Sequence, residues 1–309
     1  MPACLLEDRG IIRVAGEDAR SFLQGVITCN MDTVAPGKAG YGALLTPQGK
    51  IIVDFLVVET GEAMEPFQAV APPGFLLDCP RHLTEPLVKR LSMYKLRARV
   101  TIEALSGTEL DEPGKLAVVA QFGAKFVRQS PAIEYPDPRS AGLGLRAIMW
   151  RNAADVVTDV RERKEDREGI LSADVSVYEA HRIALGIPKG GEDFAYGETF
   201  PHEANMDLLH GLDFRKGCYV GQEVVSRVEH RGLARKRICR IEHAGQKAQQ
   251  GARILAGERE IGEVGSGILG MSLAMVRLDR VEEAARDGIT LRTDTGVEIQ
   301  SVRRPDALS

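Results

Sequence analysis

The sequence predicts an α+β fold that is followed by a C-terminal antiparallel β-barrel. Up to about residue 232, strand-like runs alternate with helical stretches, and Gly or Pro residues separate them. From residue 233 onward, short β-type runs recur with turn residues between them, which is typical of a small barrel. The 309 residues are enough for two or three domains with sizeable cores. We therefore expect one module over residues 1–232 and a barrel domain over residues 233–309.

The first hundred residues contain the clearest local signals. The turn residues Pro47, Gln48 and Gly49 separate two strand-like runs and predict a hairpin. The expected helices are Glu17–Gly25 and Pro80–Tyr94, in which apolar residues recur three or four positions apart. The expected strands are Ile11–Val14, Tyr41–Thr46, Lys50–Glu59, Gly74–Asp78 and Leu96–Ala104.

The rest of the chain is less regular until the barrel. A loop is expected at residues 129–142, and the mixed charge run Arg161–Glu168 is typical of a solvated helix face. The glycine-rich stretch Ile187–Phe200 is expected to form a functional loop. The expected helices are Asp174–Leu185, Glu203–Leu212 and Gln222–Glu229. The expected strands are Leu116–Ala120, Leu143–Met149, Lys236–Ile241, Arg253–Ala256, Glu260–Ser266, Leu273–Val276, Thr290–Leu291 and Val297–Val302.

Composition narrows the functional classes. The apolar content of 44%, the charged content of 27% and the net charge of -4 describe a globular protein that does not attract nucleic acid electrostatically. The N-terminal stretch lacks the features of a signal peptide, and no apolar run of eighteen residues is present to span a membrane. The five scattered cysteines fit reduced thiols in a cytosol-like compartment. We therefore expect a cytoplasmic protein without a membrane partner.

Reactive side chains are densest between Lys216 and Glu223, in the sequence KGCYVGQE. Cys218 is expected just before or inside the first turn of a helix, where backbone N–H groups and the helix dipole favour a negative charge. Arg215 and Lys216 add positive charge beside it, and this environment favours a thiolate. The alternative is a small buried apolar residue, as most free cysteines are. A pairing of Cys218 with His210 or His230 is a further option that sequence proximity alone does not establish.

Other motif matches are weak. His202-Glu203 begins like a zinc-protease motif, but the next histidine is His210, eight positions on instead of the four that bring two imidazoles together. No preformed metal site is therefore predicted. The glycines of Gly265–Gly270 match GxGxxG, but tight turns at barrel corners explain them better than a nucleotide loop. The basic cluster His230–Arg237 is expected to be a linker or to bind an anionic small-molecule tail, because no aromatic residues interleave it for RNA stacking.

The motif KGCYVGQE resembles the signature K-G-C-[FY]-x-G-Q-E of the YgfZ family, folate-binding proteins related to the aminomethyltransferase (GcvT) of the glycine cleavage system. The sequence EVVSRVEHRG that follows looks closest to the bacterial relatives of the mitochondrial iron–sulfur assembly factor. Further segments resemble the family, so that the likeness covers nearly the whole chain. They are Phe22–Gly25, Leu44–Lys50, Ile187–Pro188 and Phe200–Asn205.

This resemblance implies two interleaved α+β domains and a C-terminal barrel around a central channel that binds tetrahydrofolate. It also implies a role in assembling or maintaining iron–sulfur proteins, including radical enzymes that modify tRNA, without direct contact to nucleic acid. Asp54 is a counterpart of the acidic residue that the aminomethyltransferases place near the folate, or else a charged residue on an edge strand. Cys29 is expected to be a bystander.

The resulting hypothesis is a tetrahydrofolate-binding accessory factor for iron–sulfur assembly, with Cys218, Lys216 and Asp54 as its reactive residues. The Cys218 thiolate would accept a one-carbon unit, ligate iron or a cluster transiently, or react with an oxidised partner. Glu203 or Glu223 would bind the amino edge of the pterin. The expected folate-binding residues are Tyr219, Gln222, Glu223, Glu203, Asn205 and Arg227. Two alternatives stay open: a folate-dependent aminomethyl- or methyltransferase, and a folate-binding scaffold without catalysis.

Overall fold

The computed structural model describes residues 2–61, 74–105, 116–123, 132–152, 154, 171–231, 234–245 and 247–305. The chain forms two compact units. Unit 1 comprises Met1–Leu45, Val53–Tyr178 and Leu209–Val220, and unit 2 comprises Thr46–Ile52, Glu179–Leu208 and Gly221–Ser309. The predicted domain boundary at residues 232 and 233 and the charge run Arg161–Glu168 lie outside the described residues. The boundary therefore stays a prediction.

The first sheet of unit 1 has five strands in the order β3-β4-β5-β2-β6. Its strands are Gly40–Leu45 (β3), Ile51–Glu59 (β4), Gly74–Pro80 (β5), Arg9–Ala15 (β2) and Thr101–Ala104 (β6). Strands β4 and β5 are buried at nearly every position, which explains their continuous runs of apolar residues. Helices α1 (Ala19–Val26) and α2 (Thr84–Lys95) contact these strands. The predicted hairpin is confirmed, since β3 and β4 are neighbours and the turn between them is closed by hydrogen bonds.

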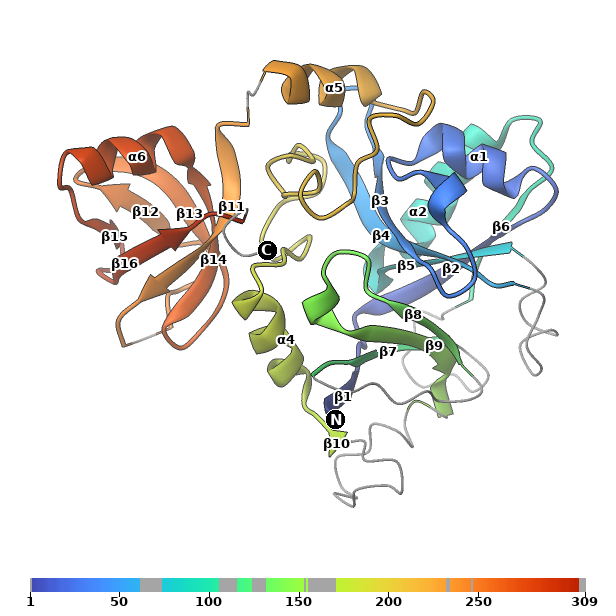
Figure 1. The fold of residues 1–309 in the computed structure, drawn as a ribbon, viewed down its shortest axis with the longest axis horizontal. Helices are drawn as coiled ribbons and strands as arrows, with labels where there is room; N and C mark the ends of the chain where they lie inside the picture. Colours follow the sequence, from blue (N-terminus) through green and yellow to red (C-terminus); the bar gives the residue numbers. More distant parts are fainter. Residues whose placement is uncertain are drawn as a thin grey trace. The chain divides into compact units, whose positions relative to one another are not determined.

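The second sheet of unit 1 takes its strands from both ends of this unit, in the order β10-β1-β7-β9-β8. They are Leu171–Ser172 (β10), Pro2–Leu5 (β1), Leu116–Gln121 (β7), Leu145–Trp150 (β9) and Ile133–Pro136 (β8). The chain starts in this sheet, builds the other sheet from β2 to β6, and then returns (Figure 1). The predicted interleaving of two α+β parts is thereby confirmed. Strand β8 falls inside the stretch expected to be a loop, and β1 was not predicted.

Unit 2 contains a closed antiparallel barrel of six strands, which confirms the predicted C-terminal architecture (Figure 1). Around the barrel the strands follow the order β11-β14-β13-β12-β15-β16. Their bounds are Lys236–His243 (β11), Arg253–Ala256 (β12), Arg259–Ile268 (β13), Met271–Arg277 (β14), Leu291–Thr293 (β15) and Glu298–Arg303 (β16). Small and branched apolar side chains such as Ile241, Ile254, Val264 and Ala274 fill its interior. Helix α6 (Leu278–Arg286), which was not predicted, packs on β12 and β14.

The glycines of the GxGxxG match belong to this barrel. A Cβ atom at Gly265 in β13 would lie 2.5 Å from Oδ1 of Asp193, and one at Gly267 would lie 2.2 Å from Oγ of Ser272. Gly270 has φ +78° in the turn between β13 and β14. Close packing and a left-handed turn therefore require these glycines, as the barrel interpretation expects.

A buried arginine holds the long loop that precedes the Cys218 motif. Arg182 on α4 (Val175–Ala184) donates hydrogen bonds to Asp193 at 2.8 Å and to Oγ of Ser266 on β13 at 2.9 Å. Asp193 in turn accepts hydrogen bonds from the backbone N–H of Lys189 and of Ser266, at 2.8 and 2.7 Å. This clamp joins helix, loop and barrel within unit 2 and gives the glycine-rich loop a fixed shape.

Two short helices are shaped differently from the expectation. The predicted helix Pro80–Tyr94 begins as a 3₁₀ turn at Arg81–Leu83 and continues as α2. The predicted helix Glu203–Leu212 is wrong, because this stretch forms successive turns. Asn205 and His210 have φ values of 59° and 61°, and left-handed residues interrupt an α-helix.

Candidate functional site

The Cys218 loop, residues 213–218, is held by hydrogen bonds at its start. Oδ1 of Asp213 accepts hydrogen bonds from the backbone N–H of Arg215 at 2.7 Å and of Lys216 at 2.9 Å. Although partial burial acts to raise it, these two hydrogen bonds lower the pKa of Asp213. Asp213 therefore stays ionised and closes an Asx-type turn that fixes the backbone immediately before Cys218.

Lys216 points into the protein and anchors the same loop. Its Nζ donates hydrogen bonds to the carbonyl oxygens of Ile27 at 2.6 Å and Cys29 at 2.7 Å. The residue is only 6% exposed, and burial lowers the pKa of its amine to about 8. Nζ also lies 5.2 Å from the centre of the Tyr219 ring. The amine that was expected to add positive charge beside the Cys218 thiol thus donates its hydrogen bonds to two backbone carbonyl groups.

The segment that receives Lys216 is itself fixed to the loop. Thr28, which is fully buried, donates its hydroxyl to the carbonyl oxygen of Gly211 at 2.6 Å and accepts a hydrogen bond from Asp213 N–H through its own carbonyl. The neighbouring Cys29 is buried, and burial raises the pKa of its thiol to about 12. Cys29 contributes its backbone carbonyl to the site while its thiol stays protonated.

Cys218 is exposed, whereas the other four cysteines are buried. The interpretation of Cys218 as a small buried apolar residue is therefore wrong. Helix α5 (Gln222–Arg231) begins four residues after Cys218, so the thiol precedes the first helical turn and is not part of it. The chain thus presents one accessible thiol, on a loop whose backbone is anchored by Asp213 and Lys216.

The remaining residues of the motif differ in environment. Tyr219 is buried, burial raises its pKa to about 12, and its hydroxyl finds no hydrogen-bond partner among the described residues. An unsatisfied buried hydroxyl is costly, which makes it a position where a bound ligand would supply the partner. On α5, Gln222 is half-buried, and Glu223 forms an exposed ion pair with Arg227 at 2.7 Å.

Asp54 is a buried carboxylate on β4, a strand that lies between β3 and β5. The alternative of a charged residue on an edge strand is therefore wrong. The hydroxyl of Tyr41 donates a hydrogen bond to Asp54 Oδ2 at 3.0 Å, and the Arg139 guanidinium lies 5.8 Å from the Tyr41 ring centre. The Tyr41 hydroxyl thus fixes the Asp54 carboxylate, and the Arg139 cation lies next to the Tyr41 ring.

Behind Tyr41 a buried network of charges connects the two sheets of unit 1. Its ion pairs join Asp78 on β5 to Arg146 on β9 at 2.6 Å, and Arg146 to Asp137 at 3.0 Å. Although burial acts to raise it, Arg139 and Arg146 lower the pKa of Asp137. The network is fully charged at neutral pH, and each charge has a partner of opposite sign.

In unit 2, Glu203 and Asn205 lie in the turns after Pro201. Glu203 Oε2 accepts a hydrogen bond from the backbone N–H of Phe200 at 2.8 Å. Asn205 is fully buried and donates its Nδ2 to the carbonyl oxygen of Ile238 at 2.8 Å, while its Oδ1 has no partner among the described residues. The two side chains therefore differ, since Glu203 is half-buried and Asn205 is sealed beside the barrel.

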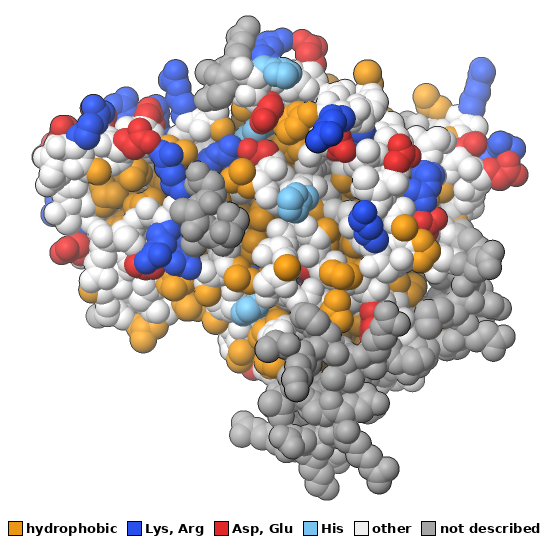
Figure 2. Space-filling model, viewed as in Figure 1, with side chains coloured by type: hydrophobic (Ala, Val, Ile, Leu, Met, Phe, Trp, Pro, Cys, Tyr) orange, Lys and Arg blue, Asp and Glu red, His pale blue; other side chains and the backbone are white. Residues whose placement is uncertain are grey.

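Glu203 lines a cavity of about 290 Å³ that lies entirely within unit 2. Three cations, Arg235, Lys236 and Arg277, line it as well, and their excess favours an anionic ligand group. A second cavity of about 540 Å³ in the same unit shares Lys236 and Arg277 with the first. On the face drawn in Figure 2, basic and acidic side chains are interspersed.

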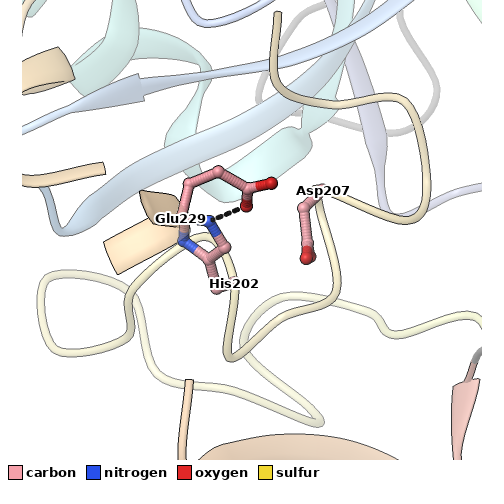
Figure 3. Close-up of side chains that lie close together, drawn as sticks. All are labelled: His202, Asp207 and Glu229. Atoms are coloured by element: carbon pink, nitrogen blue, oxygen red, sulfur yellow. Dashed lines mark hydrogen bonds and ion pairs between the residues drawn. The ribbon is translucent and has the colours of Figure 1, made fainter. Parts of the chain in front are cut away.

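Three side chains that sequence spacing did not connect lie together in unit 2 (Figure 3). His202, Asp207 and Glu229 each offer one ligand-type atom, and these atoms lie within 4.8 Å of one another. His202 Nε2 and Glu229 Oε2 are 3.1 Å apart, and Asp207 forms an ion pair with Arg237 at 2.6 Å. His210, the histidine that follows His202 in the sequence, is exposed and is not part of this cluster.

Two segments of the chain match known protein domains. Residues 7–102 match the GCVT N-terminal domain, and residues 235–307 match the C-terminal β-barrel domain of CAF17. The structure is similar to the glycine cleavage system aminomethyltransferase T from Bartonella henselae, with a TM-score of 0.74 over 100% of this chain and 86% of that chain. The sequence identity to that protein is 15%, so the likeness shows a shared GcvT-like fold.

Two relatives with similar sequences are both named iron-sulfur cluster assembly factor IBA57. The Neurospora crassa protein "Iron-sulfur cluster assembly factor IBA57 homolog, mitochondrial" is 33% identical over 243 residues, covering 75% of this chain and 52% of that protein. The human "Iron-sulfur cluster assembly factor IBA57, mitochondrial" is 30% identical over 253 residues, covering 76% of this chain and 65% of that protein. The chain thus spans roughly half to two thirds of the length of these relatives. The chain belongs to the family of these IBA57-type proteins, with a GcvT-like N-terminal domain and a CAF17-type C-terminal barrel. The more specific YgfZ resemblance stays a prediction.

These relatives also correct one expectation. Their names describe mitochondrial proteins, which overturns the cytoplasmic location predicted from the cysteines and the N-terminal sequence. Reduced cysteines do not distinguish the cytosol from other reducing compartments, so the inference was too narrow. Among the described residues, no helix is both long enough and apolar enough to cross a bilayer.

Proposed function

We propose that this chain is a tetrahydrofolate-binding accessory factor for iron–sulfur cluster assembly, with the Cys218 thiol as the group that meets the iron–sulfur partner. The observation that carries the proposal is the contrast between one exposed thiol on an anchored loop and four buried ones. Thiolates are the usual ligands of iron–sulfur clusters, and an exposed thiolate is able to share a cluster with a second protein. The names of the curated relatives support the same assignment.

The proposed partners are iron–sulfur proteins, including the tRNA-modifying radical enzymes that the YgfZ resemblance implies. Asp213 and Lys216 act in this proposal as positioning residues, because their hydrogen bonds hold the backbone of the loop and do not involve the thiol. A loop held in one conformation loses little entropy when a partner binds it. The anchors therefore favour repeated, reversible contact with a partner through Cys218.

The proposed cofactor is tetrahydrofolate or a one-carbon derivative, which supplies a carrier for one-carbon groups when bound. Glu203 is proposed to accept hydrogen bonds from the amino edge of the pterin, since one oxygen is fixed by Phe200 N–H and the side chain lines the 290 Å³ cavity. Asp54, Tyr219 and Asn205 stay proposed folate contacts on the strength of the sequence resemblance, each to be tested by itself. In unit 1, the buried Tyr219 hydroxyl has no partner among the described residues, and a polar ligand group would supply one.

On α5, Arg227 is proposed to contact the carboxylate tail of the folate, while Gln222 and Glu223 stay proposed contacts of its polar groups. Arg227 is exposed and its ion pair with Glu223 is weak in solvent, so a carboxylate of the tail is able to replace it. This exchange keeps Arg227 paired in both states. The exchange therefore costs little, because both groups are exposed to solvent.

The test is a titration of tetrahydrofolate and of 5-formyltetrahydrofolate into the wild type and into Cys218→Ala, Glu203→Gln and Asp54→Asn. We expect equal folate affinity for wild type and Cys218→Ala. Glu203→Gln and Asp54→Asn should each weaken binding by about tenfold or more, since a hydrogen bond to a charged group contributes about 1.5–3 kcal/mol. No binding by the wild type would remove the cofactor from the proposal.

The thiol is tested separately, by complementation of cells that lack the protein. The activity of their iron–sulfur enzymes should return with the wild type and fail to return with Cys218→Ser. Full complementation by Cys218→Ser would favour a scaffold without thiol chemistry. The shared fold with an aminomethyltransferase favours a second candidate, a folate-dependent transferase, which predicts turnover by the purified protein with folate and an aminomethyl carrier.

A further inference from the structure

The cluster of His202, Asp207 and Glu229 has the composition of a metal site. The imidazole of His202 and the carboxylate of Asp207 come from the turns after Pro201, and the second carboxylate comes from Glu229 on α5; in Figure 3 Glu229 meets His202, and Asp207 lies beside them. The separation of 3.1 Å between His202 Nε2 and Glu229 Oε2 is close to the spacing of about 3.3 Å between two ligands in a tetrahedral site with bonds of about 2.0 Å. All three ligand-type atoms lie within 4.8 Å of one another.

The charge balance of the cluster favours a cation. Asp207 and Glu229 contribute two negative charges, and Arg237 contributes one positive charge. Arg237 donates to both oxygens of Asp207, at 2.9 and 2.6 Å, and to the backbone carbonyl oxygen of His202 at 2.9 Å. It occupies one lone pair on each carboxylate oxygen and leaves the second for another ligand. Arg237 is therefore positioned to orient Asp207 and His202 without binding the metal ion itself.

Burial gives the site one closed and one open side. The His202 side chain is 2% exposed and that of Asp207 is 10% exposed, whereas Glu229 is 43% exposed. His202 also lines the 290 Å³ cavity of unit 2, which has room for water or another small ligand. Three protein ligands beside an open position are the arrangement found in catalytic rather than structural zinc sites.

We propose that His202, Asp207 and Glu229 bind one divalent transition-metal ion, Zn²⁺ or Fe²⁺, with Arg237 orienting the ligands. An imidazole selects these ions over Mg²⁺ and Ca²⁺, and the two carboxylates neutralise the charge of the ion. Binding replaces the contact between His202 Nε2 and Glu229 Oε2 by one bond from each atom to the ion, with the imidazole proton on Nδ1. The site uses none of the residues assigned to folate or to Cys218, although His202 lines the same 290 Å³ cavity as the proposed pterin contact Glu203.

The experiment uses the full chain with Cys218→Ser, which removes the exposed thiol as a competing ligand. After treatment with a chelator, Zn²⁺ is titrated by calorimetry. We expect one Zn²⁺ per chain and a rise in the midpoint of thermal unfolding when Zn²⁺ is added. No binding by this chain would overturn the proposal.

Glu229→Gln is the decisive variant, because this side chain is partly exposed and its replacement keeps the shape of helix α5. It should weaken Zn²⁺ binding at least about tenfold, since even outer-shell changes cost about 10–100-fold in affinity. Glu282→Gln, on the exposed surface of α6 in the same unit, is the matched control and should bind as the parent does. Equal affinity in Glu229→Gln and Glu282→Gln would show that the cluster is only an ion pair.

Discussion

Replacement of Lys216 by methionine removes the amine that anchors the Cys218 loop and leaves two buried carbonyl oxygens without a donor. Each unsatisfied carbonyl costs about 1–3 kcal/mol. At neutral pH this loss is partly offset, because the variant no longer has to bury a positive charge. The cost of the substitution therefore depends on pH, and its direction follows from the pKa of Lys216.

The pKa of Lys216 is about 8 in the folded protein and 10.5 in an ordinary lysine. Between these values the unfolded chain binds more protons than the folded chain, so the free energy of unfolding rises with pH. Between pH 7 and pH 9.5 the wild type should gain about 2 kcal/mol relative to Lys216→Met. The neutral amine keeps two hydrogens, which is enough for both carbonyl groups.

Urea unfolding at the two pH values measures this difference. The chain has one tryptophan, Trp150 on β9, so its fluorescence reports the unfolding of unit 1, which also holds Lys216. Lys38→Met removes an exposed lysine of the same unit and should keep the pH dependence of the wild type. A difference between wild type and Lys216→Met that is constant, or that shrinks toward pH 9.5, would refute the reasoning.

Three further outcomes are expected. A thiol reagent should modify one cysteine rapidly in the native protein and none in Cys218→Ser; rapid loss of a second thiol would contradict the burial of the others. Arg182→Met leaves the buried Asp193 carboxylate uncompensated and should destabilise unit 2 by about 3–5 kcal/mol, as followed by circular dichroism; a loss under about 1 kcal/mol would show that the clamp is dispensable. Gly265→Ala should cost about 1–3 kcal/mol because its Cβ meets Asp193, whereas Gly25→Ala, with open space around it, should not destabilise the protein.

Local signals in the sequence were enough for much of the fold. The turn at residues 47–49 separates two apolar runs, and the regular spacing of turns after residue 233 requires short antiparallel strands. Strand β1 was missed because it has four residues and its partner β7 begins at Leu116. Helix α6 was missed although Leu278, Val281 and Ala284 recur every three residues, because they follow a strand without a turn signal.

For the candidate site, the sequence predicted the important thiol but not the contacts around it. The motif identified Cys218 as the important thiol, and the structure adds that it is exposed. The role of Lys216 was not visible, since its acceptor on Ile27 lies 189 residues away in the chain. The cluster around His202 was missed because spacing rules search for ligands on one helix, whereas the turns at Asn205 and His210 and helix α5 assemble this one.

The connection between β1 and β2 has a consequence for how the protein is made. Strand β2 completes its sheet once residue 104 has been synthesised, whereas β1, three residues before it, pairs with β7 and β10 at residues 116–121 and 171–172. Because synthesis proceeds toward the C-terminus, both partners of β1 are made after it and after every strand of the other sheet. Strand β1 therefore stays without its full set of neighbours, and accessible to chaperones, until residue 172 has been made.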